Sequence, residues 1–179
     1  EKAIKEWKND AEYALIRSSL VCGNNSTARA MKGIKSWLTL ASSNSGISLT
    51  EAGLNNYFQA VWNTGVEVDA LYCPMYLKRK ISAYTANATK YTEISDRRLV
   101  NAVDVYEADA ARMVKLFAHR YVTVSGDTNY DLVGIKEDMF KVAYLRKPKT
   151  RELAKTGDAT NGDVVGELTL ECRNDSAGF

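Results

Sequence analysis

The first part of the chain alternates apolar and polar residues with the period of an α-helix. Ile4, Trp7 and Ala11 follow one side of this pattern, and charged residues occupy the other side. The spacing predicts one helix over Lys2–Cys22, ended by Gly23 in a left-handed conformation. At roughly 1.5 Å per residue such a helix is about 30 Å long, which is enough to span a domain of this size.

Residues 24–46 are rich in Ser, Asn, Thr and Gly, and we interpret them as a long crossover. A second helical pattern begins after this stretch. The second helix is predicted to start at Ser48 or Thr50, because Ser48 and Glu51 match a capping box, and to end at Gly65. Its predicted buried stripe consists of Leu54, Phe58, Val61 and Trp62.

The rest of the chain mixes short strand patterns with one further helix. Val68–Tyr72 is apolar and predicts a strand, after which Pro74 suits the first turn of a helix. Alternation then predicts five strands, the first two as an antiparallel pair: Val100–Tyr106, Met113–Val124, Leu132–Ile135, Phe140–Leu145 and Val164–Cys172. The predicted fold class is therefore α+β.

The composition excludes some classes of protein but does not identify a binding partner. The 179 residues are 45% hydrophobic, which excludes intrinsic disorder as the main state. Basic residues number 24 and acidic residues 22, so no electrostatic partner dominates. No apolar run reaches the roughly 18 residues that cross a bilayer, and we expect no membrane partner. Cys22, Cys73 and Cys172 lie far apart, and we interpret them as buried free thiols.

Patterns typical of enzymes are weak. His119 is the one histidine, so a histidine metal cluster has no second ligand, and we interpret His119 as structural or exposed. Asp104, Glu107 and Asp109, like Glu137–Asp138, are close enough for a carboxylate pair or a cation site, but solvated turns explain them at least as well. We assign no catalytic, cofactor-binding or metal-binding residue and expect a protein that is not an enzyme.

The clearest electrostatic signal is a basic segment, residues 141–155, with six basic residues and one acidic residue. Such a segment favours an anion or an acidic neighbour. Nucleic acid, an acidic patch of another subunit and a solvated loop are the three interpretations, and we rank the subunit contact above nucleic acid because aromatic residues for base stacking are scarce. The candidate interface residues are Arg146, Lys147, Lys149, Arg151, Lys155 and Asp158.

Three strings of residues carry a resemblance to a known family. They are Leu49–Leu54 (LTEAGL), Ala143–Arg146 (AYLR), and Leu153–Asp158 (LAKTGD) leading to Glu167–Asn174 (ELTLECRN). Together with the order of the elements, they resemble the major capsid proteins of tailed bacteriophages with the Hong Kong 97-type fold. The resemblance covers most of residues 1–179 and transfers no catalytic residue.

The resemblance implies a layout in two domains. Residues 1–46 and 140–179 look like the peripheral domain, with a long spine helix and a sheet, and residues 47–139 look like the mixed α/β axial domain. In that family an N-terminal arm and an extended loop precede the spine helix. Both are absent from this sequence, so we expect an N-terminally truncated subunit.

The resemblance also implies a structural function. The chain is expected to be a subunit of a phage or prophage capsid shell, which self-assembles around packaged DNA. Its implied partners are other copies of itself, scaffolding and portal proteins, and packaged DNA through non-specific contact. Its implied location is the virion capsid, assembled in the bacterial host cytoplasm. The alternative is a nucleic-acid-binding module that uses residues 141–155, which steep salt dependence of binding would reveal.

Overall fold

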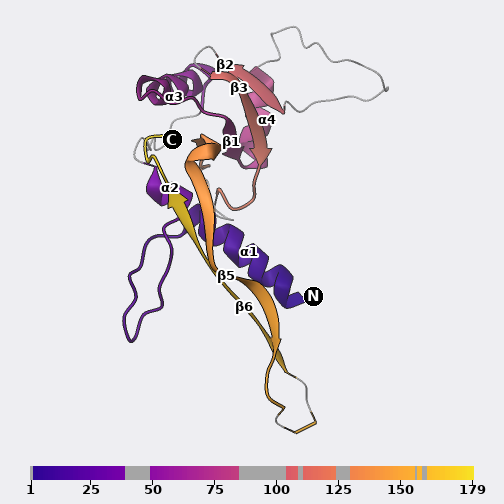
Figure 1. Cartoon of the computed structure of the whole chain (residues 1–179). Coiled ribbons are helices and arrows are strands. Elements are labelled where there is room, and N and C mark those ends of the chain that lie inside the picture. Colours follow the sequence, from indigo (N-terminus) through magenta and orange to yellow (C-terminus); the bar gives the residue numbers. More distant parts are fainter. Residues whose placement is uncertain are drawn as a thin grey trace, which may run out of the picture. The chain divides into compact units, whose positions relative to one another are not determined.

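A computed structural model describes residues 2–38, 49–84, 104–108, 111–123, 130–155, 157–158 and 161–179 (Figure 1). The chain divides into two compact units: unit 1 is Glu1–Trp37 with Asp138–Arg173, and unit 2 is Leu38–Glu137 with Asn174–Phe179. Both contain helices and strands, which confirms the expected mixture of α and β structure. Within the described ranges, no helix is both long enough and apolar enough to cross a membrane.

Unit 1 combines helices with a two-stranded ribbon. Its elements are α1 (Lys2–Arg17), α2 (Ile34–Trp37), β5 (Phe140–Glu152) and β6 (Gly162–Cys172), and the two strands pair antiparallel (Figure 1). The predicted end of the first helix was wrong, because α1 ends at Arg17 and not at Cys22. Beyond it the Ser18 carbonyl accepts a hydrogen bond from the Gly33 backbone N–H at 2.7 Å, so the chain has already turned toward α2.

Helix α1 packs closely on strand β6 where Trp7 meets Gly166. A Cβ atom added at Gly166 would lie 2.6 Å from the Trp7 ring and 3.1 Å from the Cα of Pro148. The absence of a side chain at Gly166 therefore gives Trp7 its place against the ribbon. Glycine within a strand weakens it, but here it permits the close approach of a helix.

Unit 2 is built on a four-stranded sheet in the order β2-β3-β1-β4. The strands are β1 (Ala70–Cys73), β2 (Val105–Ala108), β3 (Ala111–Ala118) and β4 (Val133–Ile135), and the helices are α3 (Glu51–Asn63) and α4 (Met75–Tyr84), with a 3-10 turn, η2, at Glu137–Met139. The predicted antiparallel pair is confirmed as β2 and β3. In addition, β1 pairs parallel to β3 and antiparallel to β4.

Helix α3 begins and ends much as its sequence predicts. Thr50 is the N-cap, and its side-chain oxygen accepts a hydrogen bond from the Gly53 N–H at 3.1 Å. At the other end Gly65 has a φ of 84° and donates its N–H to the carbonyl of Trp62. The alternative start at Ser48 lies outside the described residues.

One member of the predicted stripe of α3 was misplaced. Leu54, Phe58 and Val61 are buried as predicted, but Trp62 is 55% exposed. Trp62 follows Val61 directly and is therefore turned about 100° away from it around the helix. Because apolar residues are common on protein surfaces, sequence spacing alone does not separate a flanking tryptophan from the core.

The core of unit 2 lies between α3, α4 and the sheet. Phe58, Leu71, Ile81 and Val114 are at most 1% exposed. The Phe58 ring stacks on Tyr106 and meets Phe179 edge-on, with centroids 6.2 and 5.7 Å away. The chain's last residues thus complete this core.

The C-terminal residues also close one edge of the sheet. The backbone N–H of Phe179 donates to the Gly134 carbonyl, and the Gly134 N–H donates to the Phe179 carbonyl, both at 2.9 Å. These bonds satisfy backbone groups that the short strand β4 would otherwise leave open.

Several strand boundaries differ from the predictions. Strand β3 ends at Ala118 and not at Val124, and β5 continues past Leu145 to Glu152. The extension of β5 arises from pairing with β6, and cross-strand pairing of that kind has no local signature in an exposed, charged segment. The predicted turn at residues 125–127 and the polar loop at 85–98 lie outside the described residues. The peripheral and axial assignment of the domains stays a prediction.

Candidate functional site

The basic segment, residues 141–155, lies mostly on strand β5. This position corrects the interpretation of the segment as a solvated loop, because as far as Glu152 it belongs to a strand that pairs with β6. Every residue from Lys141 to Glu152 is exposed. The segment therefore combines a fixed backbone with solvent-accessible charges, which is suited to contact with another macromolecule.

The register of the ribbon places acidic residues of β6 opposite basic residues of β5. Arg146 is the cross-strand partner of Glu167, and Arg151 is the partner of Asp163. Directly opposite residues share one face of a ribbon, so these charges meet side by side. The acidic neighbour that the sequence called for is thus supplied in part by the same chain.

The Arg151–Asp163 pair is the closest of these contacts. The Nε of Arg151 donates to the Oδ1 of Asp163 at 3.1 Å, and the Nη2 of Arg151 donates to Oδ2 at 2.5 Å, which is a bidentate geometry. The hydrogen bonds from Arg151 lower the pKa of Asp163, and the carboxylate raises the pKa of Arg151. The second pair is looser, with 3.4 Å between Arg146 Nε and Glu167 Oε2.

The remaining predicted interface residues keep their charges available. Lys147, Lys149, Lys155 and Asp158 are exposed, and within the described ranges they form no ion pair. The structure therefore divides the six candidates into two that form ion pairs across the ribbon, Arg146 and Arg151, and four that form none in the described residues. Their role in a subunit contact stays a prediction.

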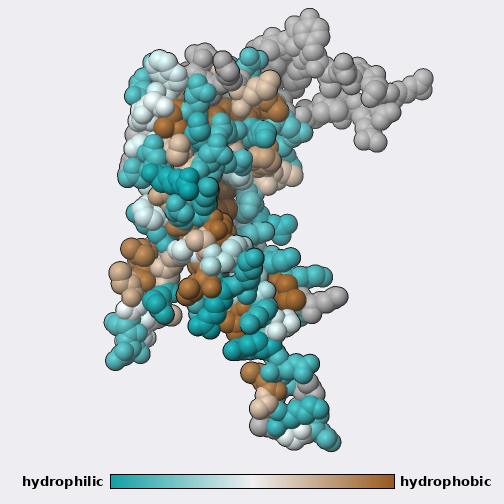
Figure 2. All heavy atoms as spheres, in the orientation of Figure 1, coloured by the Kyte–Doolittle hydropathy of each residue, from teal (hydrophilic) through white to brown (hydrophobic). Residues whose placement is uncertain are grey.

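Strand β5 is irregular and exposes an apolar residue at the irregularity. Its pairing shifts between Tyr144 and Arg146 and again between Arg146 and Lys149, so it carries two bulges. Leu145, at the first bulge, is 82% exposed. Figure 2 shows mainly hydrophilic colours over the ribbon, interrupted by hydrophobic spots. Pro148 at the second irregularity cannot donate a backbone hydrogen bond, which disfavours strand addition along this edge.

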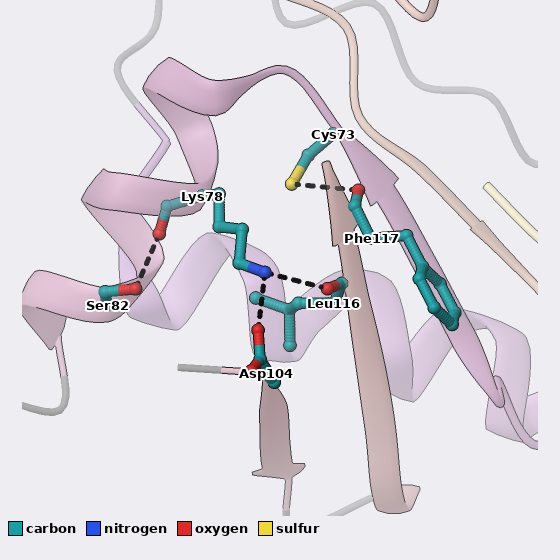
Figure 3. A network of polar contacts seen from close by, with 6 residues as sticks. All are labelled: Cys73, Lys78, Ser82, Asp104, Leu116 and Phe117. Atoms are coloured by element: carbon teal, nitrogen blue, oxygen red, sulfur yellow. Dashed lines mark hydrogen bonds and ion pairs between the residues drawn. The ribbon is translucent and has the colours of Figure 1, made fainter. Parts of the chain in front are cut away.

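Two of the carboxylates considered for catalysis, Asp104 and Glu137, have structural partners. Lys78 of α4 donates to Asp104 at 2.7 Å and to the carbonyl of Leu116 at 3.1 Å (Figure 3), which ties the start of β2 to β3. Glu137 accepts a hydrogen bond from the Tyr72 hydroxyl at 2.7 Å. Glu107 is exposed, and Asp109 lies outside the described residues. In the described part of the chain no three acidic, histidine or cysteine residues group as metal ligands.

The partnership of Lys78 was missed at the sequence level. Lys78 follows Leu77 in a predicted amphipathic helix, where a lysine is ordinarily solvent-facing. Its side chain is largely covered, while its partner Asp104 remains open to solvent. The position of Lys78, directly beside a buried residue of the helix, could have indicated that its side chain is covered. It does not identify the acidic partner.

His119 and the cysteines are accounted for by local structure. His119 follows β3, and its Nδ1 accepts a hydrogen bond from the Tyr121 N–H at 3.2 Å.

Cys73 is buried, and desolvation raises the pKa of its thiol to about 11. The expectation that all three thiols are buried was wrong, because Cys22 is exposed and Cys172 is half-buried.

The comparison with protein families identifies the class of protein. The family described as SU10 major capsid protein matches residues 1–179, the whole of this sequence. This places the chain among phage major capsid proteins, structural subunits that assemble with their own copies into the shell of the virion. The chain belongs to the SU10 major capsid protein family. No curated protein matches the chain.

Proposed function

We propose that this capsid subunit has the Hong Kong 97-type fold, with residues 1–46 and 140–179 as peripheral domain and residues 47–139 as axial domain. The order of elements supports the proposal: a long first helix packs on the terminal ribbon, and a separate helix-and-sheet unit lies between them in sequence. The unit boundaries differ at the C-terminus, where Asn174–Phe179 belong to unit 2.

Electron cryo-microscopy of assembled shells tests this fold proposal. The expected map shows each subunit with α1 as a spine helix along the ribbon, and unit 2 nearest the axis of each ring of subunits. A map in which unit 2 lies on the outer rim of the ring would contradict the axial assignment.

We propose further that the basic segment forms a contact between subunits. The observation that carries this proposal is the set of exposed lysines, Lys147, Lys149 and Lys155, which have no ion pair in the described residues but lie on or beside a strand held in place by its arginines. An acidic surface of a neighbouring copy would neutralise them. The exposed Leu145 beside them adds apolar area to the same contact.

Charge reversal tests the contact without breaking the ribbon. Lys147→Glu with Lys149→Glu leaves the Arg146 and Arg151 pairs intact and is expected to reduce the yield of shells at least tenfold, measured by sedimentation and electron microscopy. The matched control is Lys5→Glu with Lys8→Glu on α1, which changes net charge equally. Shells at the wild-type yield would remove the assignment, and equal losses in both variants would attribute the effect to net charge.

The alternative function, sequence-independent binding of nucleic acid, uses the same lysines. If all three contact phosphates, the logarithm of the affinity for duplex DNA falls with the logarithm of salt concentration with a slope of about −3. The Lys147→Glu, Lys149→Glu variant then loses DNA binding but still forms shells. Absence of binding by the wild-type chain at low salt would exclude this alternative.

The remaining proposals rest on the resemblance alone. They are assembly in the cytoplasm of the bacterial host, help from scaffolding and portal proteins, and non-specific contact of the shell's inner surface with packaged DNA.

A further inference from the structure

The end of the ribbon carries a dipeptide that the fold does not use as a turn. Asn161–Gly162 is the one Asn–Gly sequence in the chain, and it lies where β6 begins. Asn–Gly is typical of two-residue hairpin turns, in which both residues have a positive φ. Here neither residue has a positive φ, and Gly162 already pairs with Glu152 of β5. Turn geometry therefore does not account for this dipeptide.

An asparagine followed by glycine can react with its own backbone. The backbone nitrogen of the glycine attacks the side-chain Cγ of the asparagine, and a five-membered imide forms. Glycine has no Cβ to obstruct the approach, and its backbone adopts the conformations that the ring requires. Two features of a folded protein suppress this reaction: a hydrogen bond that occupies the backbone N–H, and partners that hold the asparagine amide in place.

The register of the ribbon leaves the Gly162 N–H without a bond to β5. Glu152 and Gly162 lie directly opposite each other, and the Leu153 N–H donates to the Asn161 carbonyl at 2.9 Å. Opposite residues in an antiparallel pair alternate between bonding each other and facing away. Because Leu153 bonds Asn161, the N–H of Gly162 belongs to a pair that faces away. It therefore points to the outer edge of β6, which pairs with no other strand in the described residues.

The Asn161 side chain is accessible as well. Asn161 and Gly162 are both exposed, and across the described ranges the Asn161 amide forms no hydrogen bond. The half-buried Asn174 differs, because its Oδ1 accepts a hydrogen bond from the Ser176 N–H at 3.0 Å. The bond that the Asn161 carbonyl accepts from Leu153 also polarises the peptide between Asn161 and Gly162, which makes its N–H more acidic.

We propose that Asn161 is a site of spontaneous modification, at which water converts its amide into aspartate and isoaspartate. The Gly162 nitrogen gives its proton to hydroxide and bonds to Cγ of Asn161, after which the Cγ–Nδ2 bond breaks and the amide nitrogen leaves as ammonia. Water then opens the imide. Cleavage of the bond to Cγ gives aspartate, whereas cleavage of the bond to the backbone carbonyl carbon gives isoaspartate. The proposal does not depend on the role of the basic segment.

Both products change the end of the ribbon. Positions 161 and 163 of the second strand share one face, and Arg151 lies opposite Asp163. A carboxylate at position 161 therefore adds a negative charge on the face of the Arg151–Asp163 pair. Isoaspartate also lengthens the backbone by one methylene group, so the Leu153 N–H loses its alignment with the carbonyl of residue 161.

Mass spectrometry of the folded full chain tests the proposal. The chain is incubated in mildly alkaline buffer made with water enriched in heavy oxygen, and peptide mapping locates the oxygen. Incorporation at position 161 is expected to be at least tenfold faster than at Asn174, and to yield both aspartate and isoaspartate. No incorporation at position 161 of the folded chain, whether or not the urea-unfolded chain reacts there, would overturn the proposal. Aspartate as the sole product would overturn the imide route.

Two variants test the route through the imide. Asn161→Gln keeps an amide but requires a larger ring, and Gly162→Ala obstructs the nitrogen. Each is expected to lower the rate at position 161 at least tenfold, and unchanged rates in both would overturn the route. Because a Cβ at Gly162 lies 3.1 Å from the Arg151 carbonyl, circular dichroism checks that this variant folds. Asn25→Gln, at another exposed asparagine, is the matched control and is expected to leave the rate unchanged.

Discussion

The ribbon of unit 1 and the sheet of unit 2 use the same kind of backbone pairing but bury very different amounts of side chain. In unit 2, residues such as Leu54, Phe58 and Leu71 are almost completely buried, whereas every residue of β5 after Phe140 is exposed. A two-stranded ribbon is marginally stable in water on its own. The difference teaches that unit 2 carries its own core, whereas the ribbon packs on α1 within unit 1. Support of the ribbon by neighbours in the shell stays a proposal.

The two regions also differ in how they use charge. In unit 2, Lys78 is covered and fixes β2 against β3, so its ion pair is part of the architecture. In unit 1 the ion pairs are exposed and lie beside lysines that have no partner in the described residues. Exposed pairs contribute little to stability, so the charges of the ribbon are better suited to recognition than to folding.

The largest expected effect is the loss of an aromatic residue from the core of unit 2. Phe58→Ala removes a ring packed against Tyr106 and Phe179 and is expected to lower the free energy of unfolding by about 3–5 kcal/mol. Phe117→Ala, the same change at an exposed position, is expected to cost below about 1 kcal/mol. Urea denaturation measures both, and equal costs would break the distinction between the buried ring of Phe58 and the exposed ring of Phe117.

A smaller effect is expected where α1 meets the ribbon. Gly166→Ala places a methyl group against the Trp7 ring and the backbone of Pro148, which is expected to cost about 1–3 kcal/mol in the stability of unit 1. In the background Trp7→Ala, part of that cost disappears because the ring no longer occupies the site. Strict additivity in this double-mutant cycle would show that Trp7 and Gly166 do not act together.

The smallest effect concerns pH and the Arg151–Asp163 pair. The pKa of Asp163 is lower in the folded chain than in the unfolded chain, so its carboxylate stabilises the ribbon above the unfolded pKa of about 3.9. This contribution disappears as pH falls through the folded pKa. A difference in urea midpoint between wild type and Asp163→Asn is expected at about pH 6, and it is expected to decrease as the pH is lowered below about 3.9. A difference that persists in acid would refute the electrostatic origin.

Elements with local signals were predictable from the sequence. Thr50 and Gly65 delimit α3 because capping and left-handed termination depend on residues a few positions apart. Pro74 before α4 belongs to the same kind of signal. The end of α1 and the length of β5 have no local sequence signal, because each depends on a partner distant in sequence. That partner is Gly33 for α1 and strand β6 for β5.

The candidate site was predictable in composition but not in pairing. The cluster of positive charge in the basic segment is visible in the sequence, and so are Asp163 and Glu167. Their pairing depends on a register that two bulges shift, and bulges in an exposed strand leave no pattern of alternation to detect. Trp62 was assigned to the core for a different reason: helical spacing does not separate a flanking tryptophan at the surface from the core.

Hydrogen exchange compared between the free chain and assembled shells tests the central claim that the ribbon is an assembly surface and unit 2 a self-sufficient core. Amides of β5 and β6 are expected to exchange at least tenfold more slowly in shells than in the free chain. Amides of α3 and β1 are expected to be protected in both states. Equal exchange of the ribbon in the two states would contradict the account.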